Sequence, residues 1–422
     1  MFENNQQEIQ RAVLLAADIG EYDVNVSLDE LAELAQTAGA QTAAKVSQKR
    51  TGYDPATCVG SGCLEEVKAF CQNDGANLII FDGELSASQV RNIENITGVE
   101  VIDRTTLILD IFAQRAVTGA GRLQVELAQQ KYRLPRLGGQ GNVLSRLGGG
   151  IGTRGPGESQ LETDRRHVRR RITALEKQLK ELEGQRDLLR SRRKKSGVPC
   201  VAIVGYTNVG KSTLLNALTD AGVLAEDKLF ATLDPTARAL TLPDGRTVML
   251  IDTVGLVRRL PHQLVEAFHS TLEEAVQADL LLNVCDISSP EVQEQISVTE
   301  DVIRELRERS KDRQGAEEKP ILTVLNKCDL VEDCPVPVNE RVAIISAQAG
   351  TGLEELLHKI AALLEKTQTR LRLEIPFEKG HLLGLIRQEG KIFSEEYTEK
   401  GTRVDALVDR RVLPQVEQFR VE

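Results

Sequence analysis

The stretch VAIVGYTNVGKSTLLNALT, residues 201–219, decides the fold of this chain. A run of strand-forming residues breaks at Gly205, and Gly210, Lys211 and Ser212 complete the spacing G-x4-G-K-S where a helix-forming sequence begins. Glycines let a loop wrap a phosphate with its N–H groups pointing inward, and the helix N-terminus adds a positive end. A chance glycine turn is the alternative, and the position between strand and helix argues against it. The stretch predicts a P-loop.

Residues of the P-loop and of two downstream segments are predicted to bind the phosphates and the metal. Lys211 would neutralise the charge of the β- and γ-phosphates, and the Ser212 hydroxyl would bind Mg²⁺. The segment LFATLDPT, residues 229–236, offers Thr232 as a second hydroxyl ligand. The segment IDTVG, residues 251–255, offers Asp252 for the outer coordination shell of the metal and the N–H of Gly255 to sense the γ-phosphate.

Two further strand ends indicate which base is bound. LNKCD places Asp329 just after an apolar run, where a carboxylate can accept two hydrogen bonds from guanine. Adenine lacks that donor pair, so the site predicts GTP and GDP rather than ATP. IISAQ ends another strand, and its backbone could meet the guanine O6. The predicted nucleotide-binding residues are Gly205, Tyr206, Thr207, Asn208, Val209, Gly210, Lys211, Ser212, Phe230, Ala231, Thr232, Leu233, Asp234, Asp252, Thr253, Val254, Gly255, Asn326, Lys327, Cys328, Asp329, Ser346, Ala347 and Gln348.

Catalysis is predicted to depend on Lys211, Thr232, Gly255 and Asn208. Ras-like enzymes carry a water-orienting glutamine directly after Asp-x-x-Gly, whereas this chain has Leu256. Intrinsic hydrolysis should therefore be slow unless another group places the water. Asn208 resembles the P-loop asparagine of potassium-activated GTPases, so K⁺ is a candidate cofactor beside Mg²⁺, although asparagine also suits a tight turn. The pair 258–259 is a candidate arginine finger or an ordinary surface pair.

Composition describes an ordinary protein with real cores. The 422 residues are 41% hydrophobic and 27% charged, which predicts two or three domains. No window approaches 18 consecutive apolar residues and the start lacks a secretory pattern, so we expect a cytoplasmic protein without a membrane span, and a monomer. The seven cysteines are interpreted as reduced thiols, at positions 58, 63, 71, 200, 285, 328 and 334.

Charge is unevenly distributed. The chain carries a net charge of −10, yet residues 131–195 hold 18 Lys/Arg against 7 Asp/Glu, a local charge of +11. A basic segment on an acidic protein predicts one face that meets a polyanion. The alternative is a solvated charged helix. The candidate RNA-binding residues are Arg146, Arg154, Arg165 and Arg166.

The rest of the chain predicts an α/β protein of four parts. Residues 1–104 should form an α/β domain with a mostly parallel sheet, and residues 105–197 a long antiparallel helical hairpin with a glycine-rich tip and a basic linker. Residues 198–367 should form the P-loop domain, with a mostly parallel sheet flanked by helices. Residues 368–422 should form a small α+β module. SLDELAELAQTAGA, 27–40, has Ser27 and Glu30 in capping-box spacing, which predicts a helix start there.

The hairpin is predicted from two adjacent patterns. Residues 138–157 contain nine glycines and no acidic residue. A G-x-G-x-x-G within this stretch lacks the preceding strand that a dinucleotide-binding site needs, so we reject that interpretation. Apolar residues then recur in heptad spacing, which predicts a helix roughly 43 Å long with a seam that needs a partner. These positions are Leu161, Val168, Ile172, Leu175, Leu179, Leu182 and Leu189.

Taken together, the motifs resemble one family. GGIGTRGPGESQLETDRR at 149–166, the set GYTNVGKST, FATLDPT, DTVG, NKCD and SAQ, and the preceding α/β domain are similar to the HflX GTPases over nearly the whole chain. The resemblance implies binding to the large ribosomal subunit and its RNA, and GTP-dependent splitting of stalled or idle ribosomes. It also implies a hairpin that reaches toward the peptidyl transferase centre. Some members of that family confer antibiotic resistance, and some hydrolyse ATP.

Two alternatives to ribosome splitting stay open. An assembly factor for the large subunit would have the same site, and nothing in the residues separates the two roles. A signalling GTPase with a protein partner is the third possibility, and the basic glycine-rich tip argues against it. Aromatic residues make up only 3% of the chain, so stacking on single-stranded bases is disfavoured and contacts to RNA shape and backbone are expected.

Overall fold

The computed structural model describes residues 10–137, 156–196, 198–219, 230, 236–253, 255–259, 277–311, 319–332, 339–365, 368–409 and 412–421. The chain divides into two compact units. The first is formed by residues 1–179 with 228–230 and 258–268, and the second by residues 180–227, 231–257 and 269–422. Two short pieces of the predicted P-loop domain therefore belong to the N-terminal unit. The α/β class predicted from the sequence is confirmed.

A four-stranded parallel sheet forms the centre of the first unit, in the order β2-β1-β3-β4. Residues 12–17 of its central strand are at most 1% exposed, because helices cover both faces of the sheet. The strands are β1 (Arg11–Asp18), β2 (Gln41–Lys49), β3 (Leu78–Phe81) and β4 (Glu100–Asp103). The helices are α1 (Val24–Ala38), α2 (Ser61–Asp74), α3 (Ala87–Thr97) and α4 (Arg104–Arg115).

The start of α1 differs from the sequence prediction. Asp23 is the N-cap, and its carboxylate accepts from the N–H groups of Asn25 and Val26. Ser27 and Glu30 lie inside the helix instead of forming a capping box at its start. The Ser27 hydroxyl donates to the buried carboxylate of Asp82, and the Glu30 carboxylate accepts from the buried guanidinium of Arg104. The predicted capping box is therefore wrong. The predicted glycine end is confirmed, because Gly39 caps α1 in the left-handed conformation.

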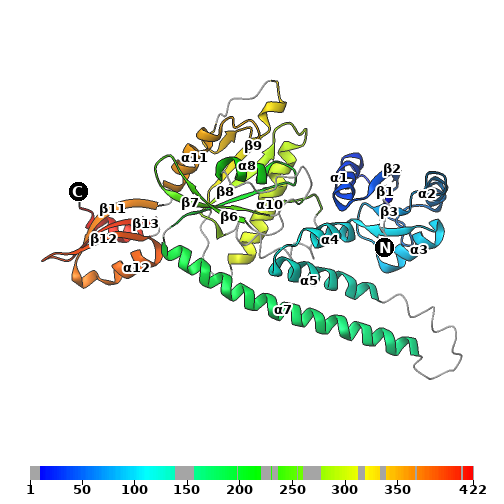
Figure 1. Ribbon diagram of the computed structural model, residues 1–422, viewed down its shortest axis with the longest axis horizontal. Coiled ribbons are helices and arrows are strands. Elements are labelled where there is room, and N and C mark those ends of the chain that lie inside the picture. The colour runs from blue at the N-terminus through cyan, green and yellow to red at the C-terminus, as the bar shows by residue number, and fades with distance from the viewer. Residues whose placement is uncertain are drawn as a thin grey trace, which may run out of the picture. The chain divides into compact units, whose positions relative to one another are not determined.

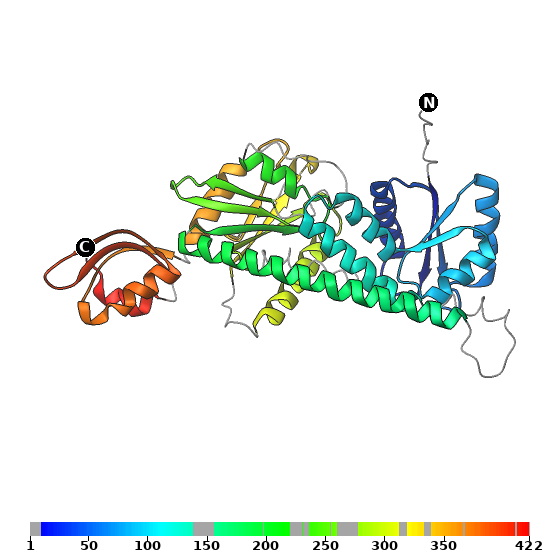
Figure 2. The same cartoon turned by 60° about the horizontal axis from the view of Figure 1, so that its bottom comes forward.

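A helical hairpin follows the N-terminal sheet. Helix α5 (Gly119–Arg136) and helix α7 (Pro156–Ser196) run side by side in opposite directions (Figures 1 and 2). Arg171 on α7 forms two hydrogen bonds to Glu126 on α5, at 2.6 and 2.7 Å. Leu175 of the predicted seam is fully buried, whereas the glycine-rich tip lies outside the described residues. The predicted basic linker is wrong, since α7 continues to Ser196 and residues 190–196 contain neither glycine nor proline.

A six-stranded sheet forms the centre of the second unit, in the order β10-β9-β8-β5-β7-β6. All neighbours are parallel except the antiparallel pair β6–β7. Ile303 of α10 packs on one face, while Leu214 of α8 and Leu356 of α11 pack on the other. The strands are β5 (Cys200–Gly205), β6 (Thr236–Thr241), β7 (Thr247–Asp252), β8 (Leu280–Asp286), β9 (Ile321–Asn326) and β10 (Val342–Ile344). The helices are α8 (Lys211–Thr219), α10 (Val292–Lys311), α11 (Leu353–Glu365) and the short η3 (Cys328–Leu330).

The C-terminal residues form the predicted small α+β module. Its three antiparallel strands are ordered β11-β13-β12 and pack Leu373 and Val404 against Ile386 of α12. The elements are β11 (Gln368–Ile375), η4 (Phe377–Lys379), α12 (His381–Glu389), β12 (Lys391–Tyr397), β13 (Thr402–Asp409), α13 (Leu413–Val416) and η5 (Glu417–Phe419).

Two global expectations can be checked over the described ranges. No helix there is both long enough and apolar enough to cross a bilayer. The six cysteines within these ranges are free thiols.

Candidate functional site

The loop between β5 and α8 has backbone geometry that requires its glycines. Gly205 has a φ of +145°, and a Cβ there would lie 2.1 Å from the carbonyl oxygen of Val284 on the neighbouring strand. Gly210 has a φ of +91°, and a Cβ there would lie 2.3 Å from Nδ2 of Asn326. Asn208 between them has a φ of +60°, which asparagine tolerates better than most residues. The loop thus has the shape of a phosphate-binding P-loop.

Lys211 begins α8 and lies inside this loop. Its side chain is buried, with 7% of its surface exposed, and its ammonium donates a hydrogen bond to the carbonyl of Tyr206. Burial lowers the pKa of Lys211 to about 8, and the nearby carboxylate of Asp252 opposes that shift. A phosphate held by the loop would favour the charged form again, because opposite charges close together stabilise each other.

The predicted metal ligands meet at one edge of the sheet. The Ser212 hydroxyl donates to a carboxylate oxygen of Asp252 over 2.9 Å, and Asp252 is completely buried at the end of β7. One hydroxyl beside one buried carboxylate is an all-oxygen donor set, which is the chemistry that Mg²⁺ prefers. The described residues thus fit the metal, and Thr232, the second expected hydroxyl ligand, lies outside them.

Leu256 pairs with the P-loop through its backbone, and Gly255 before it lies close to Thr207 and Lys211. The Leu256 N–H donates to the Gly205 carbonyl at 3.0 Å, and the Thr207 N–H donates to the Leu256 carbonyl at 2.8 Å. A Cβ on Gly255 would lie 2.7 Å from Cγ2 of Thr207 and 3.0 Å from Nζ of Lys211. The Leu256 side chain is 4% exposed and packs into the core. It occupies the sequence position of the Ras glutamine, but its side chain is buried in the hydrophobic core.

The base end of the site is joined to the P-loop by one amide. Asn326 is 2% exposed, its Nδ2 donates to the Val209 carbonyl at 2.8 Å, and its Oδ1 accepts from the Ala347 N–H at 2.9 Å. The Ser346 hydroxyl accepts from the Ala349 N–H at 3.0 Å, which shapes the turn after β10. These bonds hold the loops after β5, β9 and β10 together.

The carboxylate predicted to bind guanine is accessible. Asp329 lies in η3, is exposed, and forms no hydrogen bond or ion pair with any residue that the structure describes. Lys327 before it adopts a left-handed backbone, with a φ of +65°, and its ammonium lies 2.7 Å from Oδ2 of Asp286. Asp286 was not among the predicted site residues, although its position at the end of the apolar strand β8 indicated a place near the site.

Comparison with known proteins also identifies GTPase sequences along most of the chain. Models of the families described as GTP-binding GTPase N-terminal, GTP-binding GTPase Middle Region and 50S ribosome-binding GTPase match residues 25–113, 115–193 and 200–327. The GTPase HflX of Caldanaerobacter subterraneus is 52% identical over 410 residues, 97% of this chain and 94% of that protein. The chain belongs to the HflX family of GTPases. The Escherichia coli HflX is 42% identical over 381 residues, 89% of this chain and 88% of that protein.

A solved structure also matches most of this chain. It is a GTP-binding protein from the archaeon Sulfolobus solfataricus in complex with GDP, 25% identical, with a TM-score of 0.45, and the match covers 85% of this chain and 99% of that one. The resemblance to the HflX family that the motifs carry is confirmed by the two HflX relatives, which are 52% and 42% identical.

Several predicted site residues of this HflX-family chain lie elsewhere or are not described. Phe230 belongs to the first unit, where its ring packs edge-on against Phe112 of α4 with the centroids 4.5 Å apart. It is 2% exposed, so only its backbone could face a nucleotide. Arg165 and Arg166 lie on α7. Residues outside the described ranges are Ala231, Leu233, Asp234, Val254, Arg146 and Arg154.

The remaining predicted residues lie along the site. Tyr206 and Thr253 are buried, and the Thr253 hydroxyl donates to the Ile203 carbonyl at 2.6 Å. The Cys328 N–H donates to the Ile345 carbonyl at 3.2 Å, and Gln348 is exposed at the turn. Thr253 and Cys328 therefore contribute to the site mainly by positioning the backbone.

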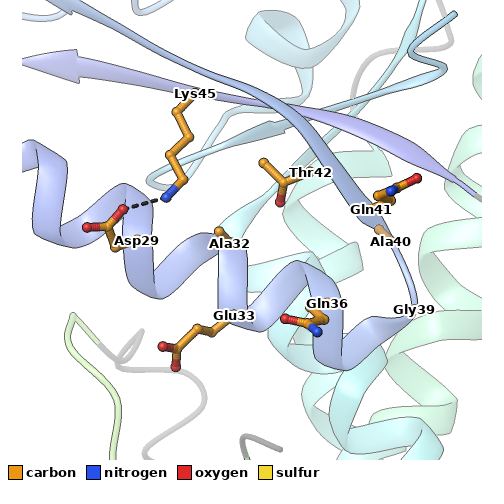
Figure 3. A pocket seen from close by; sticks show the side chains of 9 residues that line it. All are labelled: Asp29, Ala32, Glu33, Gln36, Gly39, Ala40, Gln41, Thr42 and Lys45. Carbon is orange, nitrogen blue, oxygen red and sulfur yellow. Dashed lines mark hydrogen bonds and ion pairs between the residues drawn. The ribbon is translucent and has the colours of Figure 1, made fainter.

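A surface groove of about 630 Å³ lies far from these motifs in the sequence, between α1 and the edge strand β2 (Figure 3). Lys45 reaches from β2 to Asp29 on α1 and forms an ion pair across it. The lining residues share no buried charged group or cluster of metal ligands. We assign no chemistry to this groove.

Proposed function

We propose that this HflX-family GTPase binds the large ribosomal subunit through the α5–α7 hairpin and couples GTP binding and hydrolysis to the separation of ribosomal subunits. The observation that carries the proposal is a set of arginines on α7. Arg165, Arg166 and Arg170 form no hydrogen bond or ion pair with any side chain that the structure describes. Their charge is therefore left for an external polyanion, and the phosphates of ribosomal RNA are the natural counterpart.

The ribosomal partner is supported by two further observations. The family model that matches residues 200–327 is described as a 50S ribosome-binding GTPase. The local charge of +11 over residues 131–195 contrasts with a chain of net charge −10, so the rest of the protein is repelled by RNA. That asymmetry favours one binding face over general adhesion.

At the nucleotide site, each described residue has a definite task. Lys211 holds the β- and γ-phosphates, Asp329 accepts from the guanine ring, and the Gly255 N–H donates to the γ-phosphate. Ser212 and Thr232 would hold Mg²⁺ with Asp252 behind them, and the metal would neutralise charge that develops on the phosphate oxygens. Asn208 would help to hold K⁺. Because Leu256 is buried in the core, the group that orients the attacking water must come from elsewhere, and we propose that the ribosome supplies it.

The binding part of this proposal can be tested by charge reversal on the hairpin. We expect Arg166→Glu/Arg170→Glu to pellet poorly with large ribosomal subunits. The slope of the logarithm of affinity against the logarithm of salt concentration should become shallower by about two. The matched control is Arg304→Glu/Arg341→Glu, two exposed arginines outside the hairpin, which should bind normally. Equal binding by both double variants would contradict the role of α7.

A further inference from the structure

A carboxylate outside the nucleotide-binding motifs lies beside the base end of the site. Asp286 is the last residue of β8, and in the parallel register it is paired with Asn326, the last residue of β9. Oδ2 of Asp286 lies 2.7 Å from the ammonium of Lys327. The Asp286 side chain is 16% exposed and that of Lys327 is 28% exposed, so both charges are largely withdrawn from water. This burial makes the ion pair stronger than one on an open surface.

The Asp286 carboxylate is held in place by the turn that follows it. Its Oδ1 accepts from the Ser288 N–H at 2.9 Å and from the Ser288 hydroxyl at 2.6 Å. The Ile287 N–H between them donates to the Asn326 carbonyl at 3.0 Å, which keeps the turn against the end of β9. One carboxylate oxygen therefore fixes the turn, as aspartate side chains often do, and the other is directed to Lys327.

Lys327 is fixed at its backbone as well as at its ammonium. Its φ of +65° and ψ of +35° lie in the left-handed region, which is unfavourable for a residue with a Cβ. The residues on both sides hold this conformation, because Asn326 is bonded to Val209 and Ala347 and the Cys328 N–H donates to the Ile345 carbonyl at 3.2 Å. The four methylene groups of Lys327 are thus stretched between two fixed points and have little freedom.

The role of this stretched side chain follows from the two charged residues beside it. Asp329, two positions further on, is exposed and is assigned to the hydrogen-bonding edge of guanine. An edge contact leaves the apolar faces of the ring uncovered, and the alkyl stem of a lysine can cover such a surface. The ammonium of Lys327 is neutralised by Asp286, and the phosphates have Lys211 as their own cation. The stem is therefore the part of Lys327 that remains for the nucleotide.

We propose that Asp286 is a positioning residue for nucleotide binding, which holds Lys327 so that its stem covers one face of the guanine ring. Because the stem is placed before the nucleotide arrives, the freedom of a long side chain is not lost on binding. The inference rests on the position of the base at Asp329, which is part of the proposed function, and it does not depend on the ribosomal partner. All three residues lie in the second compact unit.

The first test measures GTP and GDP affinity and GTP turnover of the full chain. Asp286→Asn keeps an oxygen for Ser288 and removes the charge that holds Lys327. We expect its affinity for both nucleotides to fall about fivefold, and the loss to appear in KM and not in kcat. The matched control is Asp244→Asn at the β6–β7 turn, where the carboxylate likewise accepts from a backbone N–H and pairs with Arg246. Unchanged or tighter binding by Asp286→Asn would overturn the proposal.

A double-mutant cycle tests whether Asp286 acts through Lys327. Lys327→Ala removes the stem and should weaken GTP binding about fivefold or more, whereas Lys327→Met keeps an unbranched apolar stem and should bind more tightly than the alanine variant. Adding Asp286→Asn to Lys327→Ala should cause no further loss, because the side chain that Asp286 positions is already gone. Additive losses would contradict the proposal. Thermal unfolding without nucleotide separates a loss of binding from a loss of fold.

Inosine triphosphate distinguishes contact with the face of the ring from contact with its edge, because it lacks the exocyclic amine of guanine. Asp286→Asn should lose the same factor of affinity for inosine triphosphate as for GTP, since both rings present the same face. An unequal loss would place the effect at the edge and contradict the proposal.

The position of the base is tested separately with Asp329→Asn. If that variant keeps its selectivity for GTP, the base position in the proposed function is wrong. If it loses selectivity while Asp286→Asn binds GTP as tightly as the unmodified protein, the base position holds and the positioning role of Asp286 is wrong.

Discussion

The side-chain amide of Asn326 donates a hydrogen bond to the backbone carbonyl of Val209 over 2.8 Å, and so ties the base end of the nucleotide site to the P-loop. Because Asn326 is buried, Asn326→Ala would leave the Val209 carbonyl and the Ala347 N–H without this partner. We expect a loss of about 1–3 kcal/mol in the free energy of unfolding. GTP affinity should fall about tenfold or more, a change worth about 1.4 kcal/mol.

Thermal unfolding and calorimetric titration with GTP would measure these two losses. Asn339→Ala is the matched control, since the side chain of this exposed asparagine accepts a local hydrogen bond from the Arg341 N–H. This change should alter stability by about 0.5 kcal/mol or less. If both variants bind GTP equally well, Asn326 does not organise the site.

Nucleotide binding should change the protonation of Lys211. Burial lowers its pKa from 10.5 to about 8. Between these values the unfolded chain holds a proton that the folded chain has lost, so the stability contribution of this group rises with pH through that window. A bound phosphate favours the ammonium form, and binding near about pH 8.5 should therefore take up a proton.

Calorimetry in two buffers of different ionisation enthalpy would detect the proton uptake, and affinity should weaken as the pH rises above about 8. Lys211→Ala should abolish tight GTP binding. Tight binding by that variant, or binding without proton uptake, would argue against the assigned role of Lys211.

Asp329→Asn should change the choice of base. The exposed carboxylate can accept from both guanine donors, whereas an amide offers one acceptor and one donor. Xanthine carries a carbonyl in place of the exocyclic amine, so the variant should prefer xanthosine triphosphate. Competition between the two triphosphates would reveal the preference, and unchanged selectivity for GTP would place base recognition at another residue.

Leu256→Gln should not convert the protein into a fast Ras-like enzyme. The side chain is buried in the core, so a glutamine there would bury an amide that lacks partners. We expect a loss of about 1–3 kcal/mol in stability and no gain in basal GTP turnover. A clear increase in turnover without loss of stability would mean that residue 256 can reach the nucleotide.

Potassium dependence can be examined with a variant that keeps the loop conformation. The backbone of Asn208 has a φ of +60°, which glycine adopts freely. Asn208→Gly therefore removes the amide while it preserves the turn. If Asn208 helps to hold K⁺, potassium in place of sodium should speed hydrolysis by the unmodified protein and not by the variant. Equal rates of the unmodified protein in both salts would limit Asn208 to the turn.

Local motifs were the part of the site that could be predicted from the sequence. The P-loop spacing, the Asp-x-x-Gly segment and the strand-end motifs each depend on a few neighbouring residues. The fold brings Ser212, Asp252 and Asn326 to one edge of the sheet. The heptad pattern likewise predicted the hairpin seam, of which Leu175 is fully buried.

Long-range polar contacts could not be predicted. Ser27 and Glu30 have the spacing of a capping box, yet they serve a buried charge network, because Asp82 and Arg104 lie far along the chain. Arg259 is 177 positions from its partner Asp82, and no local pattern marks such a pair. The burial of Phe230 could not be predicted either, because its ring packs against Phe112, which lies far away in the sequence.

The most direct test of the proposed function is GTP turnover in potassium buffer, with and without purified large ribosomal subunits. We predict strong stimulation of the unmodified protein, because the ribosome would supply the water-orienting group that Leu256 does not. Stimulation should be lost in Arg166→Glu/Arg170→Glu and retained in Arg304→Glu/Arg341→Glu. Intact GTP binding without any stimulation by ribosomal subunits would contradict the proposal and would favour a GTPase that acts on another partner.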